Sequence, residues 1–131
     1  MGAVEARFRR NADIALGSTG GAVGLHIYKG ESGDVLTVLA HAHRSSFDMV
    51  YVDGSHQAPD VLLDALLGFR LLRVGGLLVF DDYLWSEPLA YGVDPVRTPK
   101  LAIDAFTTIF CRKIRVLSAP LYQLMVRKTA E

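Results

Sequence analysis

The sequence has little cysteine, no excess of charge of either sign and no long apolar run. Its single cysteine, Cys111, cannot form a disulfide within the chain, so nothing indicates an oxidising compartment. The 14 Lys and Arg residues balance the 14 Asp and Glu residues, and a neutral chain has no long-range attraction for a phosphate backbone. No apolar run approaches the roughly 20 residues that a membrane span needs. We therefore expect a cytoplasmic protein with neither a nucleic-acid nor a membrane partner.

The chain does contain enough apolar sequence for one compact domain. Half of its 131 residues are hydrophobic and 21% are charged, which is ordinary for a globular protein. A chain of this length buries roughly two thirds of its unfolded surface around one core. Because no internal repeat or linker divides the sequence, we expect a single domain over residues 1–131.

Apolar periodicity divides the chain into alternating helices and strands. Spacings of three and four predict helices over residues 4–16, 35–40, 61–72 and the segment after Pro99. Alternating or continuous apolar runs predict strands over residues 23–29, 49–52, 77–80, 113–117 and 121–127, with Gly75-Gly76 ending the helix before the third strand. This order favours an α/β fold, a mostly parallel sheet of about five strands that ends in an antiparallel hairpin, with helices on both faces.

Acidic residues follow the predicted strands. Glu31 follows the first strand, Asp53 the second, and Asp81 and Asp82 the third. The carboxyl ends of parallel strands meet at one edge of a sheet, where open α/β folds bind ligands. A hard cation such as Mg²⁺ would offset the repulsion between these carboxylates. On spacing alone, the simpler interpretation is that Asp53 and Asp81 are the turn formers that commonly end strands.

The segment between Tyr83 and Thr98 is too long for a simple connector. It contains Trp85, two prolines and a glycine, and long loops in compact domains are commonly functional. We regard it as a candidate lid or substrate loop.

Two segments carry a resemblance to a known family. Residues Phe47 to His56, and Leu72 to Trp85 with the Gly-Gly pair inside, resemble the fourth and fifth strands of class I S-adenosylmethionine-dependent methyltransferases. Within that family they are most similar to the metal-dependent O-methyltransferases of the catechol, caffeoyl-CoA and macrocin types. Residues Val23 to Ser32 match the third strand, and the terminal hairpin is similar to the sixth and seventh strands. The resemblance implies a truncated Rossmann-like methyltransferase fold.

The resemblance also implies a metal site. Carried over residue by residue, it makes Asp53, Asp81 and Asp82 the ligands of Mg²⁺ or a similar divalent cation. Such an ion would bind the acceptor oxygen, lower its pKa and align it with the methyl group of S-adenosylmethionine.

Four further residues match positions near the methyl donor. Glu31 and Ser32 match the segment that lies along the adenine of S-adenosylmethionine, and Trp85 matches a position near the donor and acceptor pocket. Trp85 can instead be a packing anchor for its loop. His56 matches a proton acceptor or a neighbour of the donor, and a capping role at the entry of the next helix is an equally good interpretation.

The family's glycine-rich donor-binding turn and its first two strands have no counterpart in the sequence, which therefore matches the C-terminal portion of the fold. Met49 to Asp53 would then form an apolar strand with a free edge, which native proteins cover or pair. We expect the strand Val23 to Lys29 to pair with that edge directly, and homodimerisation to bury the remaining apolar surface.

Three functions follow from the resemblance. The first is metal-assisted O-methyl transfer from S-adenosylmethionine to a hydroxyl of a small-molecule acceptor. The second is a catalytically inactive remnant of the methyltransferase fold that acts as a binding or oligomerisation module. In the third, a separately encoded N-terminal half completes the site.

Overall fold

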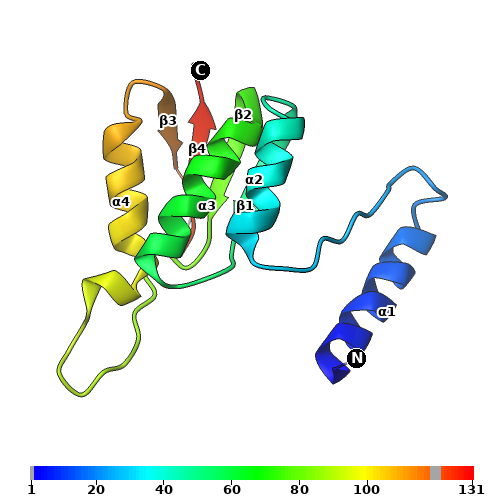
Figure 1. Ribbon diagram of the computed structural model, residues 1–131, viewed down its shortest axis with the longest axis horizontal. Helices are drawn as coiled ribbons and strands as arrows, with labels where there is room; N and C mark the ends of the chain where they lie inside the picture. Colours follow the sequence, from blue (N-terminus) through cyan, green and yellow to red (C-terminus); the bar gives the residue numbers. More distant parts are fainter. Residues whose placement is uncertain (1, 119–121) are drawn as a thin grey trace.

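The computed structural model describes residues 2–118 and 122–131, which form a four-stranded sheet with a layer of helices and one helix set apart (Figure 1). The helices and strands, in chain order, are α1 (Ala3–Gly17), α2 (Ser32–Ala42), β1 (Phe47–Val52), α3 (Ala58–Leu71), β2 (Leu72–Phe80), the 3₁₀ helix η1 (Pro95–Arg97), α4 (Pro99–Ile109), β3 (Ile114–Leu117) and β4 (Leu124–Lys128). Among these described residues, no helix is both long and apolar enough to cross a membrane. The order confirms the predicted α/β fold.

The strands are arranged in the order β1-β2-β4-β3. β1 pairs with β2 in parallel, and β4 pairs antiparallel with both β2 and β3. The predicted terminal hairpin is thus confirmed. Residues 119–121 lie outside the described residues; they belong to its predicted turn and to the start of its predicted second strand. β1 and β3 form the two edges of the sheet.

The core lies between the sheet and α3, which is flanked by α2 and α4. The rings of four phenylalanines pack together there, mostly edge to face, with centroids 4.6 to 5.9 Å apart: Phe69, Phe80, Phe106 and Phe110. All three of these helices lie on one face of the sheet in Figure 1, not on both faces as predicted. On the opposite face Met49 is 57% and Tyr51 45% exposed. The right-handed β1–α3–β2 crossover explains the side that α3 takes, and α2 packs beside it.

The predicted strand over residues 23–29 is wrong. This segment is extended but belongs to no strand, and it leads away from the sheet to α1. Among the described residues, β1 therefore has a free edge, and the sheet has four strands instead of about five. Leu25 and Ile27 remain 46% exposed each. An alternating apolar pattern fits a pleated surface, but it becomes a strand only where a partner satisfies its backbone groups.

The Gly75-Gly76 pair lies inside β2 and does not end α3, which stops at Leu71. A Cβ atom at position 76 would lie 3.0 Å from the carbonyl oxygens of both Arg73 and Asp48. The pairing of β1 with β2 shifts register here, between Phe47 and Met49. A residue without a side chain therefore lets the two strands approach at this irregularity.

Candidate functional site

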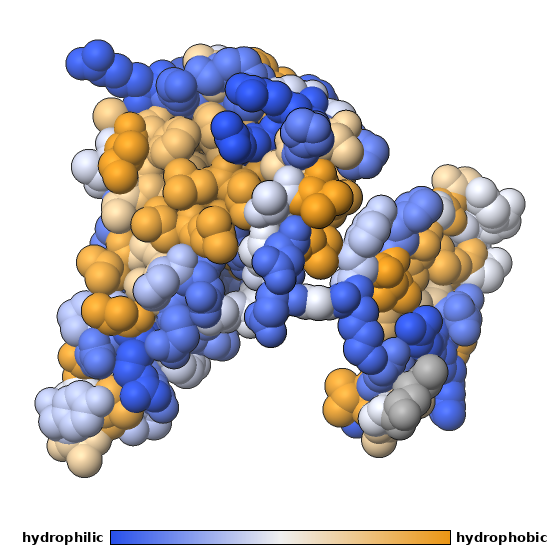
Figure 2. All heavy atoms as spheres, in the orientation of Figure 1, coloured by the Kyte–Doolittle hydropathy of each residue, from blue (hydrophilic) through white to orange (hydrophobic). Residues whose placement is uncertain are grey.

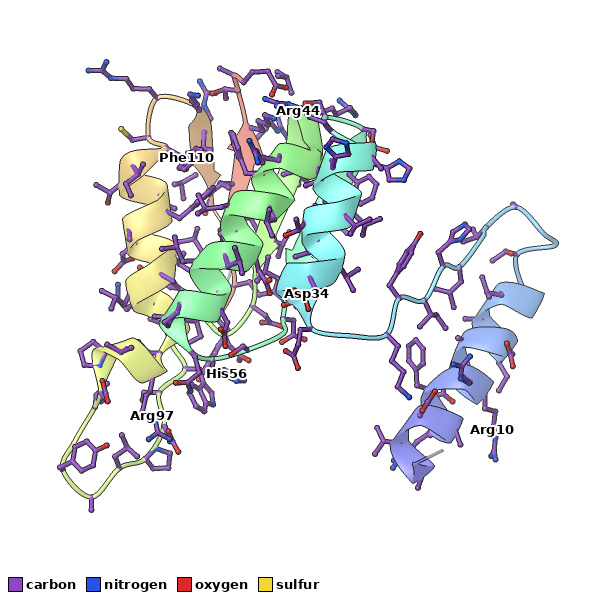
Figure 3. The ribbon with its side chains drawn as sticks, viewed as in Figure 1. Arg10, Asp34, Arg44, His56, Arg97 and Phe110 are labelled. Carbon is purple, nitrogen blue, oxygen red and sulfur yellow. The ribbon has the colours of Figure 1, made fainter. Side chains whose placement is uncertain are left out.

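The predicted acidic residues meet at the carboxyl ends of β1 and β2. Asp53 follows β1, and Asp81 and Asp82 follow β2, because the two strands run parallel and end at the same level. Together with His56 they line one small pocket at the N-terminal end of α3. Figure 3 shows His56 at this end of the molecule. The structure thus places four of the predicted site residues around a common point.

His56 and Asp82 are in direct contact. The Nε2 atom of His56 lies 3.0 Å from the Oδ2 atom of Asp82, and both side chains are 37% exposed. The indole of Trp85 packs against the imidazole, with ring centroids 4.1 Å apart. Trp85 therefore anchors its loop on His56, which is the packing role considered for it from the sequence.

Asp81 is held by partners that the sequence did not reveal. The hydroxyl of Tyr51 donates to its Oδ2 atom, and the backbone N–H of Asp82 donates to Oδ1 at 2.9 Å. The amide of Gln123, before β4, donates to the Tyr51 hydroxyl at 2.9 Å. The Tyr51 hydroxyl, and then the backbone N–H, lower the pKa of Asp81, while the same contact with Asp81 raises the pKa of Tyr51.

The carboxylates have the right chemistry for Mg²⁺ but are not arranged as its ligands. Over residues 2–118 and 122–131, no three His, Cys, Asp or Glu side chains form a group that could hold a metal ion. The oxygens of Asp81 and Asp82 accept instead from Tyr51, from a backbone N–H and from His56. Binding of a metal ion would compete with these contacts.

The predicted donor segment lies beside the same strand end. Glu31 and Ser32 line a hollow of about 570 Å³ together with Gly54 and Asp64. The Ser32 hydroxyl donates to the Oδ2 atom of Asp64 at 3.1 Å. Trp85 is not among the residues that line this hollow. The hollow thus places polar groups next to the end of β1.

Asp64 is the functional candidate that sequence analysis missed. It is 4% exposed, and its Oδ1 atom has no partner among the described residues. Burial raises the pKa of its carboxyl, and the Ser32 hydroxyl only partly offsets this shift. An acidic residue inside the apolar face of the helix was the signal in the sequence that could have identified it.

The loop from Tyr83 to Thr98 is held in part by contacts between its own residues. The Glu87 carboxylate accepts from Arg97 at 2.6 Å, and Asp94 caps η1 by accepting from the backbone N–H of Val96. Its tip is open, with Tyr91 74% and Val93 63% exposed. The exposed apolar tip is compatible with a substrate loop, as predicted.

Comparison with solved structures supports the fold. A crystal structure of a Corynebacterium glutamicum protein is similar at 25% identity with a TM-score of 0.65, over 96% of this chain and 58% of that protein. MycE, a methyltransferase from the mycinamycin biosynthetic pathway in complex with Mg, SAH and mycinamycin VI, is similar at 22% identity and a TM-score of 0.60, over 79% of this chain and 31% of MycE. The chain thus spans 58% or less of the length of these structures.

No curated protein sequence matches the chain. A family profile described as a methyltransferase domain matches residues 3–83. This match covers more than half of the sequence and includes β1, α3, β2 and the residues at both strand ends, so the chain belongs to the methyltransferase domain family.

Proposed function

We propose that this chain takes part in O-methyl transfer from S-adenosylmethionine to a hydroxyl of a small molecule, with His56 as the proton acceptor. The observation that carries the proposal is the 3.0 Å contact between His56 and Asp82 at the strand ends of a methyltransferase-family domain. The likeness to MycE adds support for the fold.

The contact suits proton transfer. With a proton on Nε2 donated to the Asp82 carboxylate, the Nδ1 atom of His56 is left as an acceptor for the proton of an incoming hydroxyl. The carboxylate then stabilises the imidazolium that forms. Trp85 on the imidazole limits its rotation, so the ring keeps its orientation.

On the donor side, the residues that would hold S-adenosylmethionine are Glu31 and Ser32, with Asp64 beneath them. When bound, this cofactor supplies an electrophilic methyl group on a sulfonium. Ser32 and Gly54 would orient its adenosine end, while the exposed loop from Tyr83 would shield the acceptor from water.

The proposal gives no step to a metal. Asp53, Asp81 and Asp82 remain candidate ligands for Mg²⁺ because they line one pocket. A titration with Mg²⁺ decides between metal-assisted and metal-independent methyl transfer.

The expectation of a cytoplasmic location still rests on the single cysteine.

A second candidate is the inactive binding or oligomerisation module, for which the free edge of β1 is the favouring observation. The uncovered face beside it, with Met49 and Tyr51, would be buried in a homodimer. Equilibrium sedimentation at micromolar concentration tests this alternative, and a monomer would contradict it.

Calorimetric titration of S-adenosylmethionine into the purified chain tests the first proposal. We expect binding that weakens in Ser32→Ala, and formation of S-adenosylhomocysteine with a hydroxyl acceptor that falls about 100-fold in His56→Ala. His41→Ala, a change at an exposed histidine outside the site, is the matched control. Absence of donor binding at high micromolar concentration would overturn the proposal for this chain.

A further inference from the structure

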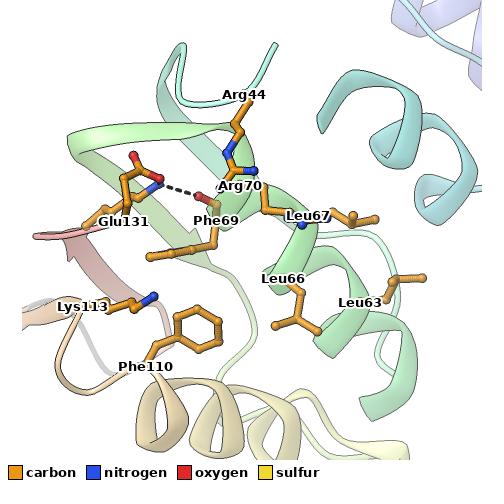
Figure 4. Close-up of a pocket in the computed structure, with 10 residues that line it drawn as sticks. Arg44, Leu63, Leu66, Leu67, Phe69, Arg70, Phe110, Lys113 and Glu131 are labelled. Atoms are coloured by element: carbon orange, nitrogen blue, oxygen red, sulfur yellow. Dashed lines mark hydrogen bonds and ion pairs between the residues drawn. The ribbon is translucent and has the colours of Figure 1, made fainter. Parts of the chain in front are cut away.

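A pocket at the other end of the helix layer combines an apolar floor with a basic rim (Figure 4). It has a volume of about 420 Å³ and is lined by residues of α3, of the segments that follow α2 and α4, and by Lys128 and Glu131. Figure 3 places Arg44 and Phe110, two of its lining residues, at the end opposite His56. The pocket therefore lies at the opposite end of the helix layer from His56, although Leu63 also lines the hollow proposed for the methyl donor.

The floor is an apolar stripe on the solvent side of α3. Leu63, Leu66 and Leu67 share one helix face with Arg70, and the ring of Phe110 borders them from the end of α4. Leu63 is 45% and Leu66 38% exposed, although the outer side of a surface helix is normally polar. Figure 2 shows apolar side chains gathered over the middle of this face, with hydrophilic residues above them. Leu67 is buried against α2, whereas Leu63 and Leu66 lack a full cover within the described part of the chain.

The rim carries three cations. In the ranges 2–118 and 122–131, Arg44, Arg70 and Lys113 take part in no ion pair, although the charge of Arg44 contributes, after Lys128 and the Ser45 hydroxyl, to the lowered pKa of Glu131. They come from three separate segments and line the same pocket. Like charges gathered at one point repel, and an anion between them would remove that repulsion.

The same rim already holds a carboxylate of the chain. Glu131 accepts from the Nζ atom of Lys128 at 3.0 Å and from the Ser45 hydroxyl at 2.9 Å. Lys128 is 1% exposed and also donates to the carbonyl oxygens of Phe69 and Leu72. Lys128 is thus fully engaged, which leaves the other three cations for an external anion.

We propose that this pocket binds a single-chain anionic amphiphile of the fatty-acid type. The carboxylate would lie among Arg44, Arg70 and Lys113, and the hydrocarbon tail would run along Leu66 and Leu63. The seven residue steps from position 63 to position 70 extend roughly 10 Å along the helix, enough for the length of a medium alkyl chain. Charge complementarity at one end and apolar surface at the other favour this ligand over a purely ionic or a purely apolar one.

Titration of monomeric octanoate, decanoate and dodecanoate into the full chain tests the proposal. We expect affinity to rise about two- to four-fold for each added methylene, because each buries further apolar surface. Dodecyl maltoside, which has the same tail and no charge, should bind at least 10-fold more weakly than dodecanoate. Equal binding of the two, or binding only to vesicles of anionic phospholipid, would overturn the proposal.

Paired variants locate the site. Arg70→Ala with Lys113→Ala should weaken dodecanoate binding at least 10-fold, whereas Arg112→Ala, next to Lys113 but outside the pocket lining, should leave it unchanged. Leu66→Gln should weaken the tail contact, with Val38→Gln, on the exposed surface of α2, as its control. Circular dichroism checks that each variant is folded. Unchanged binding in the folded Arg70→Ala, Lys113→Ala variant would rule out this pocket.

Discussion

The imidazole of His56 bridges Asp82 and Trp85: its Nε2 atom is 3.0 Å from the Asp82 carboxylate, and its ring centroid is 4.1 Å from that of the indole. Asp82 reaches this position from a left-handed backbone, with φ 52°, a conformation that Asp tolerates better than most residues. The contact joins the loops after β1 and β2. It is therefore the part of the site that substitutions can probe most directly.

Trp85 is the only tryptophan in the sequence and reports on this contact. His56→Leu should change the emission of Trp85, because the imidazole packs against the indole. Asp82→Asn, which keeps a side chain of nearly the same size, should leave this packing and the emission close to unchanged. Fluorescence emission spectra measure both. His41→Leu is the control, and an emission profile of His56→Leu that overlays the unmodified protein would contradict the contact.

The Tyr51 hydroxyl should control the titration of Asp81. This hydrogen bond lowers the pKa of Asp81 below its ordinary value of 3.8, so Tyr51→Phe should raise that pKa toward 3.8. A carboxyl whose pKa is lower in the folded state than in the unfolded chain stabilises the fold at pH values above its unfolded-state pKa. This stabilisation is lost as the pH falls through the folded-state pKa. The variant should therefore lose less stability on acidification below pH 4.

Carboxyl NMR titration of Asp81 measures this shift. Tyr91→Phe, at a tyrosine that is 74% exposed in the long loop, should leave the Asp81 curve in place. A curve that is the same in Tyr51→Phe and the unmodified protein would show that the hydroxyl does not hold the carboxylate in solution.

Gly76 in β2 should tolerate a methyl group poorly. Gly76→Ala places a Cβ atom 3.0 Å from two backbone oxygens, of Arg73 and Asp48, which cannot move without shifting the strands. Overpacking of this kind costs about 1–3 kcal/mol of unfolding free energy. Gly24→Ala, where nothing lies within 4 Å, should be neutral. Urea unfolding compares the two, and equal midpoints would contradict the close approach of β1 and β2.

Local patterns were sufficient to predict the strand ends. Asp53 and Asp81 each follow a short apolar run, and parallel pairing of those runs brings the two residues to one edge. The partners Tyr51 and Gln123, 72 residues apart, meet only because β4 returns beside β2. Residues 23–29 show the opposite case, since their pattern is that of a strand but no partner strand reaches them. The sequence of one segment thus predicts its local secondary-structure propensity. Whether a segment with strand propensity becomes a strand depends on pairing with segments distant in the sequence.

Asp64 should make the protein less stable as its carboxyl ionises. Burial raises its folded-state pKa above 3.8, so the folded protein binds this proton more tightly than the unfolded chain, and stability falls as pH rises from about 3.8 to the raised value. Asp64→Asn cannot ionise and keeps an acceptor for Ser32, so it should gain about 1 kcal/mol at pH 7 and nothing below pH 3. Asp13→Asn, on the exposed surface of α1, should show no such gain. Urea unfolding from pH 3 to 8 measures the difference, and a gain that does not grow with pH would contradict ionisation of a buried Asp64.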